Sequence, residues 1–170
     1  VSTVKGLSGS FQNLISNSLS RMKRLIIVPM INKADNAHNY SPMESPYCSE
    51  PATCSPHYIR DFQVSLSGQN VYSQSIETKY DQFLNELEGK FGLNGGRTDG
   101  LSSSLISMKD FESTFGYLVV DLSRRREADN LTPLALEIKG TVSSPKSLDL
   151  LIYCEFERDL SLDLATGATL

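Results

Sequence analysis

The chain has 170 residues, of which 39% are hydrophobic, and a formal net charge of −4. This length and apolar content suffice for one folded domain with a sizeable core, which excludes disorder of the whole chain. No run of eighteen apolar residues occurs, so we expect no membrane span. The charge is uneven, at +3 over residues 1–60 and −7 over residues 61–170. This asymmetry favours contacts between unlike surface patches over specific nucleic-acid binding.

The first sixty residues contain one clear strand. Residues 1–5 are too few to classify, and the Ser- and Asn-rich residues 6–20 fit either a helical turn or a loop that buries its apolar side chains. The β-branched run Met22–Ile31 indicates a strand buried on both faces, with Pro29 at an edge or a bulge because proline cannot donate to a ladder. Residues 32–56 hold four of the seven prolines and predict a long irregular loop, a kind of loop that is usually functional or interfacial.

The middle of the chain predicts a strand, a turn and a helix. Residues 58–66 alternate between apolar and polar positions, and residues 67–70 supply a turn. Residues 78–91 change to helical spacing and predict an amphipathic helix that Gly92 caps. The side chains expected on its apolar face are Tyr80, Phe83, Leu84, Leu87 and Phe91, and those expected on its other sides are Asp81, Glu86 and Glu88.

Three strands are predicted in the last third, over residues 115–122, Leu134–Val142 and Leu148–Phe156. We expect the last two to form an antiparallel hairpin around residues 143–146, with one face on a core and the other wet. The positions predicted to be core are Leu118, Val120, Leu136, Ile138, Leu150, Ile152 and Phe156. The wet positions, which form either a solvated face or a subunit interface, are Glu137, Lys139, Tyr153, Glu155 and Glu157.

Seven or eight short strands with one inserted amphipathic helix predict an all-β fold. The arrangement expected is a two-sheet antiparallel β-sandwich over residues 1–170, either immunoglobulin-like or of jelly-roll type. The long loops and the inserted helix favour the jelly roll.

His38, Cys48, Cys54 and His57 are the candidate metal ligands, because thiolates and imidazoles in one loop can enclose a tetrahedral zinc ion. Nine residues separate His38 from Cys48 and five separate the cysteines, whereas structural zinc sites pair ligands at shorter intervals. A Cys48–Cys54 disulfide and free thiols remain alternatives, depending on the redox compartment. Cys154 lies on an apolar face and is expected to be a buried small hydrophobe.

Enzyme motifs are missing from the sequence. No Gly-x-Ser-x-Gly elbow occurs, and the glycine-rich residues 92–98 lack the Lys-Ser/Thr pair of a phosphate loop. Arg124, Arg125 and Arg126 stand beside Glu127 and Asp129, as in a solvated or interface element. We therefore expect no catalytic residue and no cofactor.

Several segments occur in an order that resembles one protein family. They are residues 22–31, 32–56, 64–72, 80–87, 116–123, 134–139 and 150–156. Together they resemble the second jelly roll of the double jelly-roll major capsid proteins of the Maverick/Polinton and adintovirus lineage. The resemblance covers nearly the whole chain, and its most specific parts are the last three segments.

The resemblance implies a viral structural protein of the virion that assembles inside the host cell. The chain would be the C-terminal half of a longer double jelly-roll polypeptide, which fits a start at Val1 instead of Met. Three such polypeptides would close into a pseudo-hexameric capsomer of an icosahedral shell. The implied partners are two further copies, neighbouring capsomers, and penton and minor capsid or cement proteins.

Three alternatives stay open from the sequence. A single jelly-roll penton or minor capsid protein would be complete at about this length. A cellular β-sandwich module for carbohydrate or peptide would carry a concave face of exposed aromatics, and the chain has no Trp. A metal-dependent enzyme would need His38 and His57 to converge with carboxylates.

Overall fold

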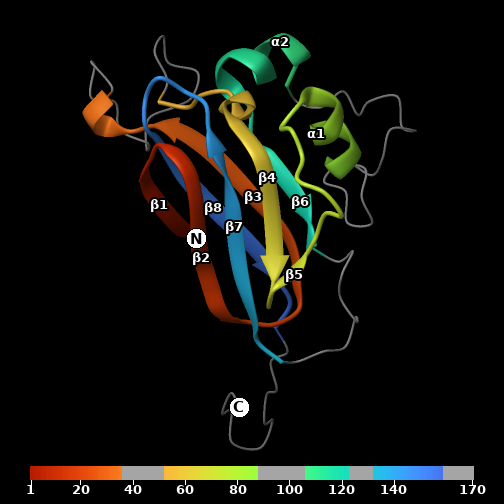
Figure 1. Ribbon diagram of the computed structural model, residues 1–170. Helices are drawn as coiled ribbons and strands as arrows, with labels where there is room; N and C mark the ends of the chain where they lie inside the picture. Colours follow the sequence, from red (N-terminus) through yellow and green to blue (C-terminus); the bar gives the residue numbers. More distant parts are fainter. Residues whose placement is uncertain (36–51, 88–105, 123–131, 159–170) are drawn as a thin grey trace, which may run out of the picture.

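The computed structural model describes residues 1–35, 52–87, 106–122 and 132–158. These residues form a two-layer antiparallel β-sandwich with few helices, so the predicted all-β sandwich is confirmed (Figure 1). The strands are β1 (Ser2–Leu7), β2 (Gly9–Leu19), β3 (Met22–Ile31), β4 (Ile59–Leu66), β5 (Gln69–Asn70), β6 (Leu118–Asp121), β7 (Leu134–Val142) and β8 (Leu148–Phe156).

Each layer is a four-stranded sheet. The strand order is β1-β8-β3-β6 in one, called sheet A, and β2-β7-β4-β5 in the other, called sheet B. Figure 1 is viewed onto sheet B, with sheet A behind it. The pairing is nested along the chain, since β1 pairs with β8, β2 with β7, β3 with β6 and β4 with β5. The pairs β3–β8 and β4–β7 join these nested pairs into two sheets.

The inner faces of the two sheets bury one continuous apolar core. Alternation puts every second side chain of a strand on the inner face, which is why these positions are apolar. Six of the seven predicted core residues are confirmed as buried, namely Leu118, Val120, Leu136, Ile138, Leu150 and Ile152. Phe156 is the exception, with 44% of its surface exposed. It lies at the last position of β8, where it lines a surface pocket and is not enclosed between the sheets.

The predicted hairpin between the last two strands is wrong. β7 pairs with β2 and β4, whereas β8 pairs with β1 and β3, so the two strands belong to different sheets. Residues 143–147 therefore cross from one layer to the other. Alternation identifies which side chains of each strand face a core, but it does not identify the neighbouring strand, and the prediction failed at that step.

The N-terminal prediction of a helical turn or loop is also wrong. Residues 2–19 form β1 and β2, the outermost strands of sheets A and B on one side of the molecule. The pairing of β2 with β7 shifts between Leu14 and Ser16 and again between Ser16 and Leu19. Each shift is a bulge, and a bulge changes the phase of the alternation. The regular period that would have revealed β2 is therefore interrupted.

β3 agrees with its prediction in bounds, but only one of its faces is fully buried; on the other face Arg24, Ile26 and Val28 are partly buried. Pro29 lies opposite Leu150 of β8, at a point where the pairing with β6 has already ended. Its carbonyl accepts a hydrogen bond from the Cys54 backbone N–H at 3.1 Å. The nitrogen of Pro29 faces the same side as its carbonyl, so the missing N–H interrupts no pairing with β6 or β8.

β4 contains a bulge that the sequence pattern hid. Asp61 has a positive φ of 50°, and the pairing with β7 shifts between Arg60 and Gln63. As a result Ile59 and Phe62 are both buried, although simple alternation assigns them to opposite faces. The turn predicted over residues 67–70 is shorter: Ser67 and Gly68 form it, both with positive φ as in a type I′ hairpin turn, and residues 69–70 already belong to β5.

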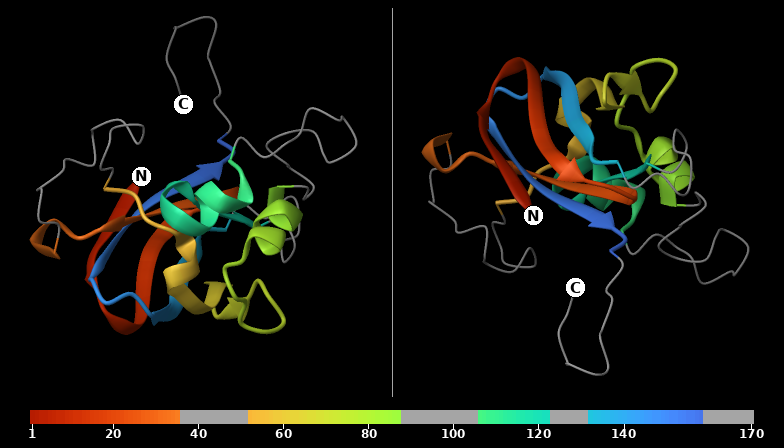
Figure 2. Two further views of the ribbon diagram at one scale, coloured as in Figure 1. Left: turned by 90° about the horizontal axis from the view of Figure 1, so that it is seen from above. Right: turned by 90° about the horizontal axis from the view of Figure 1, so that it is seen from below.

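Two α-helices lie at one end of the sandwich, α1 (Tyr80–Leu87) and α2 (Met108–Asp110), followed by a π-helix at Phe111–Phe115 (Figures 1 and 2). The predicted helix is confirmed over Tyr80–Leu87 and begins two residues later than predicted, while Phe91 and Gly92 lie outside the described residues. The strand predicted over residues 115–122 is shorter, because the π-helix includes Phe115. Phe83, Leu87, Phe111 and Val119 form a second apolar cluster, which packs α1 on the outer face of β6.

Glu86 differs from its predicted position on a polar side of the helix, because it is buried with 3% of its surface exposed. One carboxylate oxygen accepts the backbone N–H of Asp121 at 3.1 Å, and the other accepts from the Gln82 amide at 3.0 Å. Asp121 belongs to β6, the edge of sheet A. The helix thus supplies a hydrogen-bond acceptor to a strand edge that a further strand would otherwise occupy.

Side-chain hydrogen bonds fasten this helical end to the sandwich. The Thr78 hydroxyl donates to the carbonyls of Pro56 and Ile59, and the Ser55 hydroxyl donates to the Phe111 carbonyl at 2.9 Å. Across the end, Asp35 accepts from the backbone N–H of Ser147 at 2.7 Å and from its hydroxyl. These bonds lower the pKa of the Asp35 carboxyl, since they stabilise its charged form.

In the part of the chain that the structure describes, no helix is long and apolar enough to cross a membrane.

Gly116 is required where the π-helix meets the sandwich, which gives a prediction for stability. A Cβ at this position would overlap the Pro56 ring and lie 2.8 Å from the Phe111 carbonyl oxygen. Gly116→Ala should therefore lower the free energy of unfolding by about 1–3 kcal/mol, measured by urea unfolding followed by circular dichroism. Gly140→Ala is the comparison: its Cβ would lie 3.1 Å from a Phe11 ring carbon and 3.2 Å from the Arg60 carbonyl oxygen, a tight fit without overlap, so we expect a smaller loss. Equal losses for the two variants would contradict the packing described here.

Candidate functional site

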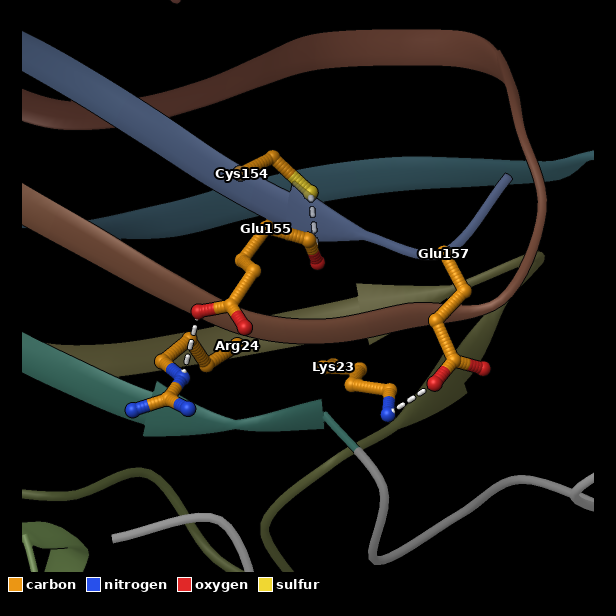
Figure 3. Close-up of polar contacts among 5 residues, drawn as sticks. All are labelled: Lys23, Arg24, Cys154, Glu155 and Glu157. Carbon is orange, nitrogen blue, oxygen red and sulfur yellow. Dashed lines mark hydrogen bonds and ion pairs between the residues drawn. The ribbon is translucent and has the colours of Figure 1, made fainter. Parts of the chain in front are cut away.

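Two predicted interface residues, Glu155 near the end of β8 and Glu157 just after it, lie beside the basic residues Arg24 and Lys23 of β3 (Figure 3). Arg24 forms an ion pair with Glu155, with 2.7 Å between Nε and the carboxylate oxygen. Lys23 forms a second ion pair, with Glu157. The four side chains make two adjacent pairs of opposite charge. We call them the ionic group of sheet A.

A bulge in β3 explains how two consecutive residues reach the same face. Met22 lies opposite Phe156 and Arg24 opposite Glu155, so Lys23 is the extra residue on β3. In a regular strand Lys23 and Arg24 would point to opposite faces, whereas here Arg24 reaches Glu155 in β8 and Lys23 reaches Glu157 just after it. Consecutive basic residues at this point of the sequence are therefore accommodated without burying either charge in the core.

The acidic partners remain half in water. The side chains of Glu155 and Glu157 are 50% and 51% exposed, while Arg24 and Lys23 are 14% and 22% exposed. The basic side chains cover the sheet with their aliphatic stems. An exposed ion pair contributes about 0–1 kcal/mol to stability, so the group sets the charge pattern of the face more than it holds the fold together.

Next to the ionic group, the same face carries an apolar strip. Tyr153 lies opposite Ile26, and Leu151 lies opposite Val28. Tyr153 is 42% exposed, and the other three are partly buried. We call these four residues the sheet A strip. On the other side of Ile26 lies Val119, which α1 covers. The apolar surface that α1 covers over β6 therefore continues beyond the helix onto β3 and β8.

The other two predicted interface residues, Glu137 and Lys139, lie on β7 in sheet B. Glu137 accepts hydrogen bonds from the Gln12 amide at 3.3 Å and from the Ser65 hydroxyl at 3.5 Å, and Lys139 is exposed. The structure therefore separates the predicted set, with two residues on the outer face of sheet B and three on sheet A. This separation follows from the crossing of β7 and β8 between the layers.

A pocket of 580 Å³ opens at the end of the sandwich opposite the helices. It is lined by Ser18, Leu19, Ser20, Arg21, Phe156, Glu157 and Arg158. Sequence reasoning missed it because it forms where the β2–β3 turn meets the end of β8, and no motif marks that meeting. Its exposed ring, Phe156, was the one predicted core residue that is not buried.

Of the four candidate metal ligands, the structure describes Cys54 and His57. His38 and Cys48 lie outside the described residues. Cys54 is 4% exposed and packs in the main core, whereas His57 is exposed in the 3₁₀ helix Pro56–Tyr58. Among the described residues, no three metal-binding side chains converge. The zinc hypothesis for this loop stays a prediction, whereas the structure has Cys54 as a free thiol and not in the suggested disulfide.

Both described cysteines are free thiols. Burial raises the pKa of Cys54 to about 12 and the pKa of Cys154 to about 11. Cys154 is only partly buried, whereas its apolar position predicted a buried residue, and its sulfur lies 3.9 Å from the Glu155 carbonyl oxygen (Figure 3). A raised pKa leaves a thiol protonated and unreactive at neutral pH.

Comparison with protein-family models, curated proteins and solved structures finds no match to this chain.

The ionic group gives a prediction about the size of the coupling energy between its charges. In a double-mutant cycle of Glu155→Gln and Arg24→Gln, we expect a coupling energy below about 1 kcal/mol, because Glu155 is half exposed. The coupling should fall further in 1 M NaCl, which screens exposed charges. Urea unfolding of the four proteins gives the value. A salt-insensitive coupling well above this range would mean that the pair is shielded from water.

The buried cysteine Cys54 gives a prediction about how thiol labelling depends on pH. At pH 8 a thiol with a pKa of about 12 is ionised in roughly one molecule in 10⁴, so Cys54 should react very slowly with iodoacetamide in the folded protein. Labelling should rise with pH and become fast at pH 8 in urea, which exposes the residue. Peptide mass spectrometry reads out each site. Rapid labelling of Cys54 in the folded state would contradict its burial.

Proposed function

We propose that this chain is a jelly-roll coat domain, a structural part of a viral capsid without a catalytic reaction. The nested strand pairing carries the proposal. A jelly roll arises when one long antiparallel hairpin folds over into two sheets, so that first and last strands pair, then second and second-last, and so on inward. The pairs β1–β8, β2–β7, β3–β6 and β4–β5 follow that rule.

The different ends of the sandwich also support a coat domain. The described helices gather at one end, where they are fastened by Ser55, Thr78 and Asp35. The opposite end has the two-residue turn at Ser67–Gly68 and the short link between β2 and β3. Among the described residues the helices therefore mark one end and short turns the other, and such a difference suits a shell, where outside and inside face different surroundings.

The outer face of sheet A suits contact with a neighbouring subunit. The sheet A strip offers partly exposed apolar surface, and the ionic group beside it offers two half-exposed carboxylates. An apolar centre with a polar rim is the usual composition of a protein interface. Of the five interface residues predicted, Tyr153, Glu155 and Glu157 therefore have the better setting, because they belong to or adjoin the partly exposed apolar strip of sheet A.

The proposed mechanism is self-assembly. Three polypeptides, each with two jelly rolls of which this chain is the second, would close into a pseudo-hexameric capsomer, and capsomers would tile an icosahedral shell with penton and cement proteins. Such a protein would reside in the virion after assembly in the host cell. The sequence resemblance and the nested pairing support this reading together, while a single jelly-roll shell protein would share the pairing alone.

The oligomeric state of the natural polypeptide that contains this chain tests the proposal. We expect native mass spectrometry to give a trimer and electron microscopy to show a particle with a hexagonal outline. Tyr153→Lys should weaken the trimer at least about tenfold, because it places a charge in the sheet A strip. Tyr58→Lys is the matched control, since Tyr58 is 37% exposed at the helical end.

Three outcomes would count against the proposal. A monomeric natural polypeptide no longer than this chain would contradict the double jelly-roll coat. A trimer equally affected by both tyrosine variants would contradict the role of sheet A. Specific binding of an oligosaccharide by a monomer would favour the cellular binding module.

A further inference from the structure

Three of the sandwich's four edge strands are protected against pairing with another strand. β6 is covered by α1, and Glu86 accepts the backbone N–H of Asp121. β5 is only two residues long. β1 carries the exposed Lys5, and its pairing shifts between Val4 and Leu7. A covering helix, a short strand, a lysine and a bulge are the usual protections of a sheet edge.

β2 lacks these protections over residues 10–14. Its pairing with β7 runs without interruption from Ser10 to Leu14, before the first bulge. No charged residue and no proline occurs in Gly9–Leu19. In the part of the chain that the structure describes, β2 pairs with β7 alone. We call residues 10–14 the β2 edge segment. It is a regular, uncharged strand with one side unoccupied by any described strand.

The backbone of this segment can accept another strand. In an antiparallel ladder, successive residues of an edge strand point their N–H and C=O groups alternately toward the partner and away from it. The groups that point away from β7 are therefore available to extend the ladder. Leu14 adds an apolar side chain at the end of the segment, with 56% of its surface exposed.

We propose that two copies of this chain pair through the β2 edge segment, antiparallel and about a two-fold axis, and so join their B sheets into one continuous sheet. The second copy is favoured as the partner because the segment is uncharged, so self-pairing brings no like charges opposite one another. A two-fold contact also needs one surface complementary to itself. This contact is separate from sheet A and does not depend on the proposed coat function.

The geometry fixes the register of the pairing. The inner face of one sheet continues as the inner face of the other, and opposed residues point to the same face. The two-fold axis must therefore place one residue of β2 directly opposite the same residue of the second copy. Gly9 has a positive φ of 67°, which leaves residues 10–14 as the regular stretch with Gln12 at its centre. Gln12 then lies opposite Gln12 of the second copy, and Ser10 lies opposite Leu14.

Cysteine cross-linking tests this register. Opposed residues have Cβ atoms about 4.5–5.5 Å apart, within reach of a disulfide. Gln12→Cys should therefore form a covalent dimer on mild oxidation, with the 12–12 link identified by mass spectrometry. Ser10→Cys and Leu14→Cys should each fail alone, because each of these residues lies roughly 14 Å along the strand from its own copy. A mixture of those two variants should cross-link.

Charge gives the second test. Gln12→Lys places two lysines opposite each other and should raise the dimer dissociation constant at least about tenfold in analytical ultracentrifugation. Gln69→Lys is the matched control, because it makes the same change on β5, at the other edge of sheet B. We expect it to leave the dissociation constant within about twofold. Circular dichroism verifies that each variant is folded.

The proposal fails if the unmodified chain stays monomeric at every concentration tested. It also fails if Gln12→Lys and Gln69→Lys weaken the dimer equally, or if links form at position 10 or 14 alone and not at 12. A dimer disrupted by Tyr153→Lys and unaffected by Gln12→Lys would place self-association on sheet A instead. These results are independent of whether the natural polypeptide forms trimers.

Discussion

The pairing of β3 with β8 is the contact on which the rest of the sandwich depends. The two strands form the middle of sheet A and are more than a hundred residues apart in the chain. β1 can pair only once β8 is in place, and β6 only once β3 is. The inner side chains Leu25, Ile27, Leu150 and Ile152 then supply one wall of the core. Contacts of such long range close large loops, which makes a fold of this kind slow to form.

Alternation in the sequence was sufficient for the long, regular strands and insufficient elsewhere. The bounds of β3, β7 and β8 agree with prediction, because these segments hold their apolar pattern over nine or ten residues. β2 was missed because bulges after Leu14 interrupt its period. The neighbours of β7 and β8 were misjudged since the side-chain period says nothing of strand pairing. For the same reason Glu137 and Tyr153, predicted to share a wet face, lie on opposite sides of the molecule.

The two outer faces satisfy their polar groups differently. On sheet B, neutral side chains donate hydrogen bonds to a carboxylate, as Gln12 and Ser65 do to Glu137. Sheet A concentrates opposite charges at one end of the face and leaves apolar side chains beside them. Removing water from sheet A therefore costs less along the sheet A strip than at the ionic group. The proposed subunit contact on this face follows from that difference in desolvation.

The order of the strands along the chain has a consequence for biosynthesis. β8 is the last strand of the described chain to be translated, yet it lies between β1 and β3 in the finished sheet. Until β8 emerges from the ribosome, the edge of β3 that pairs with β8 has no partner, and β1 cannot join sheet A. A nascent chain stopped before residue 148 would present that edge to chaperones and to other nascent chains. Translation of this domain therefore leaves the β3 edge that β8 later occupies exposed until β8 has been made.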